Sequence, residues 1–547
     1  MSKKFLFIIF LLGLFFFISC TGDKGKDSNK KIFRYNEKAG ISSLDPAFAK
    51  DQACIWACNQ IYNGLVQLND KLEVRPCIAK SWTISTDGLR YTFYLRDDVF
   101  FHDHSLFPKG KGRRVVASDF EYSLKRIIDP TVASPGAWIF NNVNDNLSEF
   151  NFKALNDSTF VILLKKQFPA FLSMLSMQYC SVIPKEIVEY YGKDYRKNPV
   201  GTGPFQFIKW NEGIKLVLRK NPTYFEKEGG VSLPYLDGVA ITFNTDMQSV
   251  FLEFLKGNID FLNSIHPGYK DELLTKNGHL NPKYANKFYV LTEPYLNTEY
   301  LGFLMDSSSN STKTTPSQAK LIRQAINYGF DKRKMIKYLR NSIGIPGLYG
   351  FIPAGMPSFD SVSSKGYAYN PEMAKKLLIE AGYPNGEGLP EITLSIDKTY
   401  LDLCEYIQHQ LNEIGIQIKI DVNPPATLRE MIANSKIKFF RGSWIADYPD
   451  AENYLSLFYS KNFSPKGPNY THFKNEKYDL LYEKSQKEIN DSVRFEYYKK
   501  MDRILIEESP VIVLYYDQVL RFCQKNISGL TSNPMNLLNL KKVKKDI

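Results

Sequence analysis

Residues 391–445 read EITLSIDKTY LDLCEYIQHQ LNEIGIQIKI DVNPPATLRE MIANSKIKFF RGSWI, and they decide the fold class. Apolar residues first alternate with polar ones, then follow a helical spacing, and both patterns return. Strands are expected over 392–396, 416–420 and 437–443, with helices over 401–414 and from Thr427 onward. This β-α-β-α-β order predicts a largely parallel sheet with helices on its faces, and hence an α/β fold.

The rest of the body continues the alternation of strands and helices. A last helix is expected over 491–508, and the apolar strand 511–516 follows it. The chain has 547 residues, too many for one hydrophobic core, so two or three lobes are expected. Because no linker rich in Pro, Gly or Ser separates them, the lobes should be joined by strands and not by a flexible tether.

The amino terminus has the pattern of a secretory signal. Lys3 and Lys4 precede an apolar run over 5–18, which is shorter than a membrane span and ends in Ser19-Cys20. A small residue before a cysteine in this place is typical of lipoprotein processing. We therefore expect a signal peptide over 1–19, a lipid on Cys20 and a polar tether over 20–31. The alternative is an ordinary signal peptide with a chance cysteine.

The charge of the chain is basic but dispersed. The formal net charge is +12, and loss of residues 1–19 would lower it to +10. Lys and Arg are scattered among 58 acidic residues without a dense basic run. This distribution does not favour a nucleic-acid partner. It favours a basic surface near anionic lipid headgroups.

Motifs for metal binding and catalysis are weak or missing. The chain has seven cysteines and no CxxC pair, so zinc is not expected, although a disulfide between Cys54 or Cys58 and Cys77 stays open. His102-Asp103-His104 looks like a metal pair, but no metal or other cofactor is predicted. The sequence contains no G-x-S-x-G and no H-E-x-x-H motif, which argues against an enzyme.

A series of short motifs carries a family resemblance. In chain order these are Ser43-Leu44-Asp45-Pro46, Ile61-Tyr62-Asn63-Gly64-Leu65, Ala79-Lys80-Ser81-Trp82, Asp87-Gly88-Leu89-Arg90-Tyr91-Thr92-Phe93, Gly201-Thr202-Gly203-Pro204-Phe205 and Trp444-Ile445-Ala446-Asp447-Tyr448-Pro449-Asp450. With them the chain resembles the peptide and nickel family of ABC-importer solute-binding proteins, which includes the oligopeptide- and dipeptide-binding proteins. The resemblance covers nearly everything after the tether.

The resemblance implies a periplasmic-binding-protein-like fold with three lobes. Two mixed α/β lobes would close on a hinge around the ligand. Carried over, domain I would take 32–66, 200–288 and 508–547, domain II 67–199, and domain III 289–507. The implied protein is a monomer that faces the periplasm or the exterior and delivers short peptides to an importer permease and ATPase complex.

The resemblance also implies a ligand site around the last motif. In the family an Asp after the Trp-x-x motif pairs with the peptide ammonium, and here that position is Asp447. An Arg six residues earlier can pair with the carboxylate of a short peptide, and here it is Arg441. Without a ligand role, Asp447 would be a turn or helix-cap residue and Arg441 an exposed strand charge.

The resemblance implies further ligand contacts. Gly442 and Ser443 continue a strand whose backbone can pair with a peptide, since strand addition is insensitive to side chains. Trp444 would wall a side-chain pocket, and Tyr35 and Asn36 would lend contacts from domain I. Where oligopeptide binders carry an aromatic residue after Ser-Pro, this chain departs from the family with Gly136.

Two alternatives of different kinds stay open. The same scaffold can carry haem, nickel chelates or oligosaccharides, so fold alone does not name the ligand. The second alternative is a surface lipoprotein hydrolase, which would need a nucleophile with a base, paired carboxylates or a metal triad.

Overall fold

The computed structural model describes residues 30–144, 151–263, 267–305 and 319–547. The predicted signal peptide, Cys20 and most of the predicted tether lie outside the described residues. Within the described ranges, no helix is both long and apolar enough to cross a membrane.

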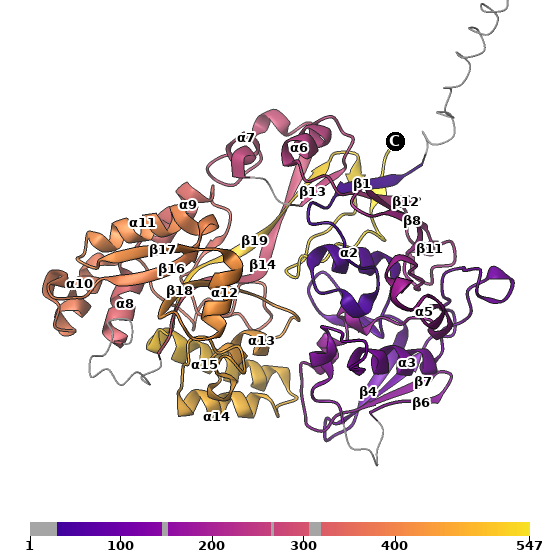
Figure 1. Ribbon diagram of the computed structural model, residues 1–547, viewed down its shortest axis with the longest axis horizontal. Coiled ribbons are helices and arrows are strands. Elements are labelled where there is room, and N and C mark those ends of the chain that lie inside the picture. Colours follow the sequence, from indigo (N-terminus) through magenta and orange to yellow (C-terminus); the bar gives the residue numbers. More distant parts are fainter. Residues whose placement is uncertain (1–29, 145–150, 264–266, 306–318) are drawn as a thin grey trace, which may run out of the picture.

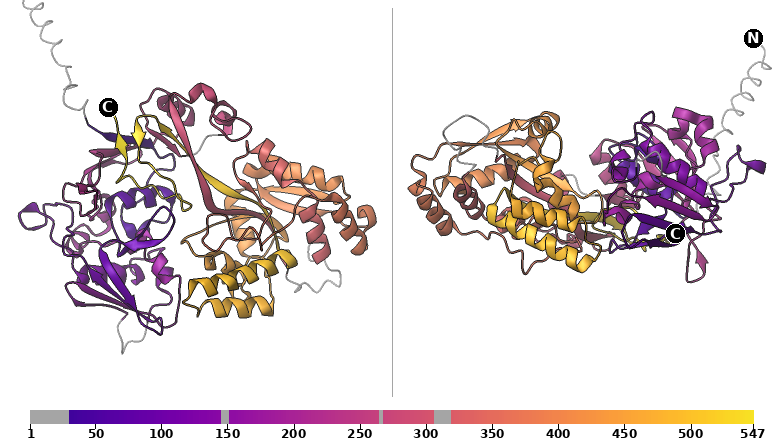
Figure 2. Two further views of the ribbon diagram at one scale, coloured as in Figure 1. Left: turned by 180° about the vertical axis from the view of Figure 1, so that it is seen from behind. Right: turned by 90° about the horizontal axis from the view of Figure 1, so that it is seen from below.

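One large mixed sheet runs through most of the molecule. Its strand order is β17-β16-β18-β14-β19-β13-β1-β12-β9-β8, and β15 pairs with β19. The two longest strands, β14 (Phe288–Phe303) and β19 (Val511–Gln524), are antiparallel neighbours at its centre. They run from one half of the molecule to the other (Figures 1 and 2). Their register shifts between Pro294 and Thr298, so the sheet is irregular where it passes between the halves.

The half of this sheet that contains the first strand is called lobe I here. Its strands are β1 (Ile32–Asn36), β8 (Phe205–Asn211), β9 (Lys215–Lys220), β12 (Gly238–Thr242) and β13 (Phe261–Asn263). Its helices are α2 (Gln52–Ile61), α6 (Met247–Leu255) and α7 (Lys270–Leu273), and the hairpins β10 (Lys227–Glu228)/β11 (Val231–Ser232) and β20 (Ile527–Ser528)/β21 (Lys544–Lys545) lie at its edge.

A separate antiparallel sheet of four strands forms lobe II. Its order is β4 (Ala79–Ile84), β5 (Arg90–Leu95), β7 (Thr159–Leu163) and β6 (Phe152–Asn156). Helices α3 (Ala117–Ile128), α4 (Phe171–Met174) and α5 (Lys185–Tyr191) accompany it, and the hairpin β2 (Val66–Leu68)/β3 (Val74–Pro76) leads into it. Lobes I and II share one hydrophobic core, to which both Trp56 and Phe93 belong.

The other half of the large sheet is lobe III. Its strands are β15 (Ile345–Pro346), β16 (Ile392–Asp397), β17 (Ile418–Asn423) and β18 (Phe439–Ile445). Its helices are α8 (Lys320–Tyr328), α9 (Lys332–Leu339), α10 (Pro371–Glu380), α11 (Leu401–Asn412), α12 (Pro425–Ala433), α13 (Glu452–Leu455), α14 (Glu476–Ser485) and α15 (Asp491–Glu508). The lobe contains two separate apolar cores, one around Ile396 and one around Tyr300.

The α/β class predicted from residues 391–445 is confirmed, and each predicted element is present within a few residues of its expected limits. Strand β16 pairs in parallel with β17 and with β18, as the element order predicted. The sheet as a whole is nevertheless mixed, because β14 and β19 are antiparallel to each other and β14 is antiparallel to β18. The limits of the three predicted domains stay a prediction.

Candidate functional site

A cleft lies where lobes I and II face lobe III. Its volume is about 330 Å³, within the range usual for small-molecule sites. Most of its lining is apolar or aromatic, and the large apolar and aromatic side chains are Ile55, Trp56, Leu68, Trp138, Met177, Tyr179, Tyr295, Ile445, Met535 and Leu537. Among the described residues that line it, Lys50 from lobe I and Asp447 from lobe III carry charge. The cleft therefore offers one cation, one anion and a largely apolar wall between them.

The Asp447 carboxylate stands in the middle of the motif over 444–450 and lines the cleft. The Asn453 Nδ2 atom donates to its Oδ2 across 3.4 Å, and the Asp447 backbone N–H donates to Asn453 Oδ1 across the same distance. No cationic side chain of the described residues lies within ion-pair distance of it. Surrounding protein atoms remove water from the carboxylate and raise its pKa, while the bond from Asn453 works in the opposite direction. Asp447 thus holds a negative charge for which the described residues supply no counter-ion.

Strand β18 leads directly into this carboxylate and has an open edge beside it. One edge of β18 pairs with β14 from Phe439 to Ile445. On the other edge, β16 reaches β18 at Phe440, and the structure pairs no described strand with Gly442, Ser443 or Ile445 there. Ser443 is exposed and Gly442 is half-buried; neither lines the cleft itself, which the strand reaches at Ile445. A peptide can add to this edge by backbone hydrogen bonds, with its amino end toward Asp447.

Arg441 lies on the same strand but inside lobe III. Its guanidinium forms an ion pair with buried Glu299 of β14, lies 3.7 Å from Asp397 and stacks over the Tyr400 ring. These partners keep the charge of Arg441 satisfied within the lobe, and Arg441 does not line the cleft. The structure therefore separates it from Asp447, although the sequence places the two residues close together.

Trp444 supports Asp447 indirectly. Its indole Nε1–H donates to Asn453 Oδ1 across 2.9 Å, and Asn453 is the residue that also bonds Asp447. The ring itself packs against the core around Tyr300 and does not line the cleft.

Tyr35 and Asn36 lie outside the cleft lining. The Tyr35 ring is buried in the core shared by lobes I and II, edge-on to Trp56. The Asn36 side chain donates to the carbonyl of Asn244 and accepts from its backbone N–H, which ties the end of β1 to the chain after β12.

Several cleft residues were not predicted from the sequence. Lys50 precedes α2 and Gln52 begins it, Trp138 and Tyr179 come from lobe II, and Tyr295 comes from β14. None stands in a motif with a chemical signature. The departure at Gly136 was a partial signal, because a Cβ atom there would lie 2.4 Å from the Tyr179 ring. Gly136 leaves the space in which Tyr179 stands against the cleft.

The comparisons with known proteins agree with this architecture. A family model described as "Bacterial extracellular solute-binding proteins, family 5 Middle" matches residues 73–466. The chain belongs to this family.

Relatives of this solute-binding protein match along almost its whole length. It is 24% identical over 544 residues to the dipeptide-binding protein DppE of Bacillus subtilis, covering 95% of this chain and 93% of DppE. It is 27% identical over 504 residues to the glutathione-binding protein GsiB of Salmonella typhi, covering 91% of each. Its structure matches that of DppA from Helicobacter pylori, an ABC transporter-associated periplasmic binding protein in complex with the peptide STSA. That match has a TM-score of 0.71 and 25% identity, and covers 94% of this chain and 98% of DppA.

These findings confirm the predicted family and the predicted binding-protein fold. The chain is an extracytoplasmic solute-binding protein of the class that serves ABC importers, and it is not an enzyme.

The lobes of this solute-binding protein touch beside the cleft. Tyr448, the residue after Asp447, is buried in the core of lobes I and II, and its ring centroid lies 6.2 Å from that of Trp138. In the other direction, Leu72 at the tip of the β2/β3 hairpin is buried in the core around Tyr300. Each side of the cleft thus packs one side chain into the hydrophobic core of the other side.

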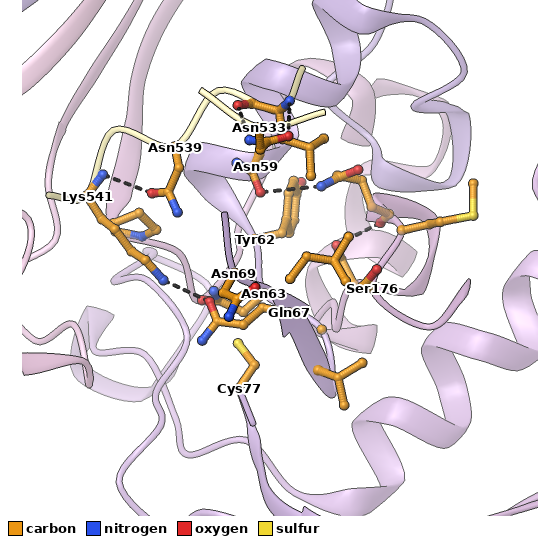
Figure 3. A pocket seen from close by; sticks show the side chains of 18 of the residues that line it. Asn59, Tyr62, Asn63, Gln67, Asn69, Cys77, Ser176, Asn533, Asn539 and Lys541 are labelled. Carbon is orange, nitrogen blue, oxygen red and sulfur yellow. Dashed lines mark hydrogen bonds between the residues drawn. The ribbon is translucent and has the colours of Figure 1, made fainter. Parts of the chain in front are cut away.

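A second, more polar cavity of about 70 Å³ adjoins the cleft within lobes I and II (Figure 3). Its side chains are already bonded to one another or to the backbone. Gln178 donates to Asn59, and Lys541 donates to Gln67. The cavity is therefore part of a satisfied polar network in the solute-binding protein, and the charged cleft is the better candidate for the ligand site.

The cysteines and histidines singled out in the sequence have structural positions. The six described cysteines are free thiols and buried. The His102 ring is buried against the Gly203 carbonyl at 2.9 Å, and burial lowers its pKa to about 4. The His104 ring contacts Tyr191. In the part of the chain that the structure describes, no three His, Cys, Asp or Glu side chains gather in a metal-binding arrangement.

Proposed function

We propose that this protein captures short peptides and delivers them to an ABC importer. The observation that carries the proposal is the Asp447 carboxylate, which faces the cleft at the end of an open strand edge and has no counter-ion among the described residues. A carrier of varied peptides must bind what all of them share, namely the ammonium, the backbone amides and the carboxylate.

The peptide ammonium would pair with Asp447. A charge-assisted hydrogen bond is about twice as strong as a neutral one, so a single carboxylate at this place can anchor the amino end of a peptide. Backbone amides of the peptide would pair with Gly442 and Ser443 on the open edge of β18. Neither contact depends on the identity of the peptide side chains.

The peptide carboxylate would pair with Lys50. The predicted partner, Arg441, already neutralises Glu299 inside lobe III, whereas exposed Lys50 lines the cleft and makes no ion pair within the described residues. A cleft of about 330 Å³ suits a short ligand between the two charges.

Membrane attachment through a lipid on Cys20 belongs to the same proposal. It is supported by the signal-like run over 5–18 and by Ser19 before the cysteine. Metabolic labelling with an alkyne fatty acid is expected to mark the wild-type protein and not Cys20→Ala. Equal labelling of the two proteins would refute the anchor.

The peptide proposal is tested by calorimetric titration of the unlipidated chain that begins at Thr21. The ligands are a pool of di- to pentapeptides and the same pool after N-acetylation. Binding of the free pool and much weaker binding of the acetylated pool are expected. If folded, ligand-stripped protein binds neither pool, the peptide proposal is wrong, and haem, metal chelates and oligosaccharides become the next ligands to titrate.

A further inference from the structure

Exposed lysines gather at the edge of lobe I where the two ends of the described chain meet. Lys31 precedes β1, Lys544 lies on β21, and Lys525 and Lys287 stand beside them, all four with exposed side chains. In Figure 1 the carboxyl terminus lies next to β1, at the point where the described chain begins.

Backbone and side-chain contacts bring together the chain segments that carry these lysines. The Lys545 Nζ atom donates to the Ile32 carbonyl across 3.0 Å, which fixes β21 against the start of β1. The Lys525 backbone N–H donates to the Lys287 carbonyl across 3.1 Å. Ser528 of β20 pairs with Lys544 of β21, two residues after which the chain reaches Asp546. We name Lys31, Lys287, Lys525 and Lys544 the terminal lysine patch.

The charge of this patch is only partly balanced by the protein. Two neighbouring lysines have partners, since Lys545 pairs with buried Asp260 and Lys542 pairs with Glu228. By contrast, the structure gives the four patch lysines no ion pair with any described carboxylate. Lys544 lies over the Tyr235 ring, 4.6 Å from its centroid.

Some negative charge lies nearby. Asp237 and Asp546 are exposed on the same edge, and the Glu228 carboxylate interacts electrostatically with Lys544. The Asp237 carboxylate already accepts one hydrogen bond, which the Lys31 backbone N–H donates to its Oδ2 atom. With Lys542 and Lys545 this edge carries six lysines, and Asp237, Asp546, Glu228 and Asp260 supply four carboxylates. The net charge of the edge is therefore positive.

We propose that the terminal lysine patch binds an anionic lipid bilayer and sets the orientation of the protein on it. Basic side chains near an anionic surface each contribute about 1 kcal/mol of attraction, and the effect fades within a Debye length of about 8–10 Å. The patch can therefore attract only a membrane surface that lies within about this distance.

The place of the patch in the chain argues for a bilayer and against a nucleic acid. Lys30 follows Cys20 by ten residues, and a chain of that length spans at most about 36 Å. If Cys20 carries a lipid, the patch lies where the tether joins the folded protein, within that distance of the anchor. Membrane binding by the patch would be a function beyond peptide capture. Its test requires neither a bound peptide nor a lipid on Cys20.

The test uses the unlipidated chain from Thr21, which keeps every described helix and strand. It is sedimented with vesicles of phosphatidylcholine alone or of phosphatidylcholine mixed with phosphatidylglycerol. Binding to the mixed vesicles, none to the neutral ones, and release by added salt are expected. The triple variant Lys31→Gln, Lys525→Gln, Lys544→Gln is expected to lower the partition coefficient by about fivefold for each lysine removed.

A matched control removes the same charge from lobe III. The variant Lys337→Gln, Lys376→Gln, Lys419→Gln changes three exposed lysines far from the termini in the sequence and is expected to keep wild-type binding. Wild-type protein that ignores anionic vesicles would overturn the proposal. Equal loss of binding in the two triple variants would also overturn it, because net charge and not the patch would then be responsible. Thermal melting of both variants confirms that each is folded.

Discussion

Replacing Asp447 by Asn should weaken peptide binding without disturbing the fold. The two side chains have the same shape, and the oxygen of the new amide could still accept the bond from Asn453 Nδ2. What is lost is the charge that would face the peptide ammonium. A hydrogen bond to a charged group contributes about 1.5–3 kcal/mol, so the dissociation constant should rise by roughly 10- to 150-fold.

The pH dependence of wild-type binding gives an independent signature. Burial raises the pKa of the Asp447 carboxyl in the free protein. Because the ammonium needs the ionised carboxylate, affinity should be complete above this raised pKa and should fall as the pH drops through it. Affinity should fall again above about pH 8, where a peptide amino group loses its proton. Asp447→Asn should lack the acidic limb.

Calorimetry of wild type and Asp447→Asn with a free and an N-acetylated peptide completes a thermodynamic cycle. Acetylation should weaken binding to the wild type and have little further effect on the variant. Asp402→Asn on α11, which removes another exposed carboxylate away from the cleft, should behave as wild type. Acetylation that weakens both proteins equally would refute the pairing of Asp447 with the ammonium.

Three further variants test Arg441, Gly136 and the buried Asp502 of lobe III. Arg441→Met leaves Glu299 buried without its partner, so it should cost about 3–5 kcal/mol of stability in urea unfolding. A normal stability with lost peptide affinity would instead return Arg441 to the ligand. Gly136→Ala should push the Tyr179 ring toward the cleft and weaken peptide binding in titration, at an overpacking cost of about 1–3 kcal/mol, and unchanged affinity would contradict this. Burial raises the pKa of Asp502 to about 7. The folded state therefore binds this proton more tightly than the unfolded state, and stability should fall by at most about 4 kcal/mol from pH 4 to pH 7. Asp502→Asn should remove that slope, and a slope equal to the wild type would disprove the assignment.

The sequence by itself determined the secondary elements and the family. Strands and helices over 391–445 follow from the spacing of apolar residues, which local geometry converts directly into a buried face. The position of Asp447 was also accessible, since it stands in a contiguous motif beside the strand that leads to it.

The tertiary structure alone decided which residues share the cleft. Lys50, Trp138 and Tyr179 come from segments far from Asp447 in the chain, and no local pattern marks them. It also placed Arg441 beside Glu299, which lies 142 residues away on β14, so no local pattern could reveal this ion pair. The sequence specifies which side chains carry charge. The fold decides whether an oppositely charged group lies next to each of them.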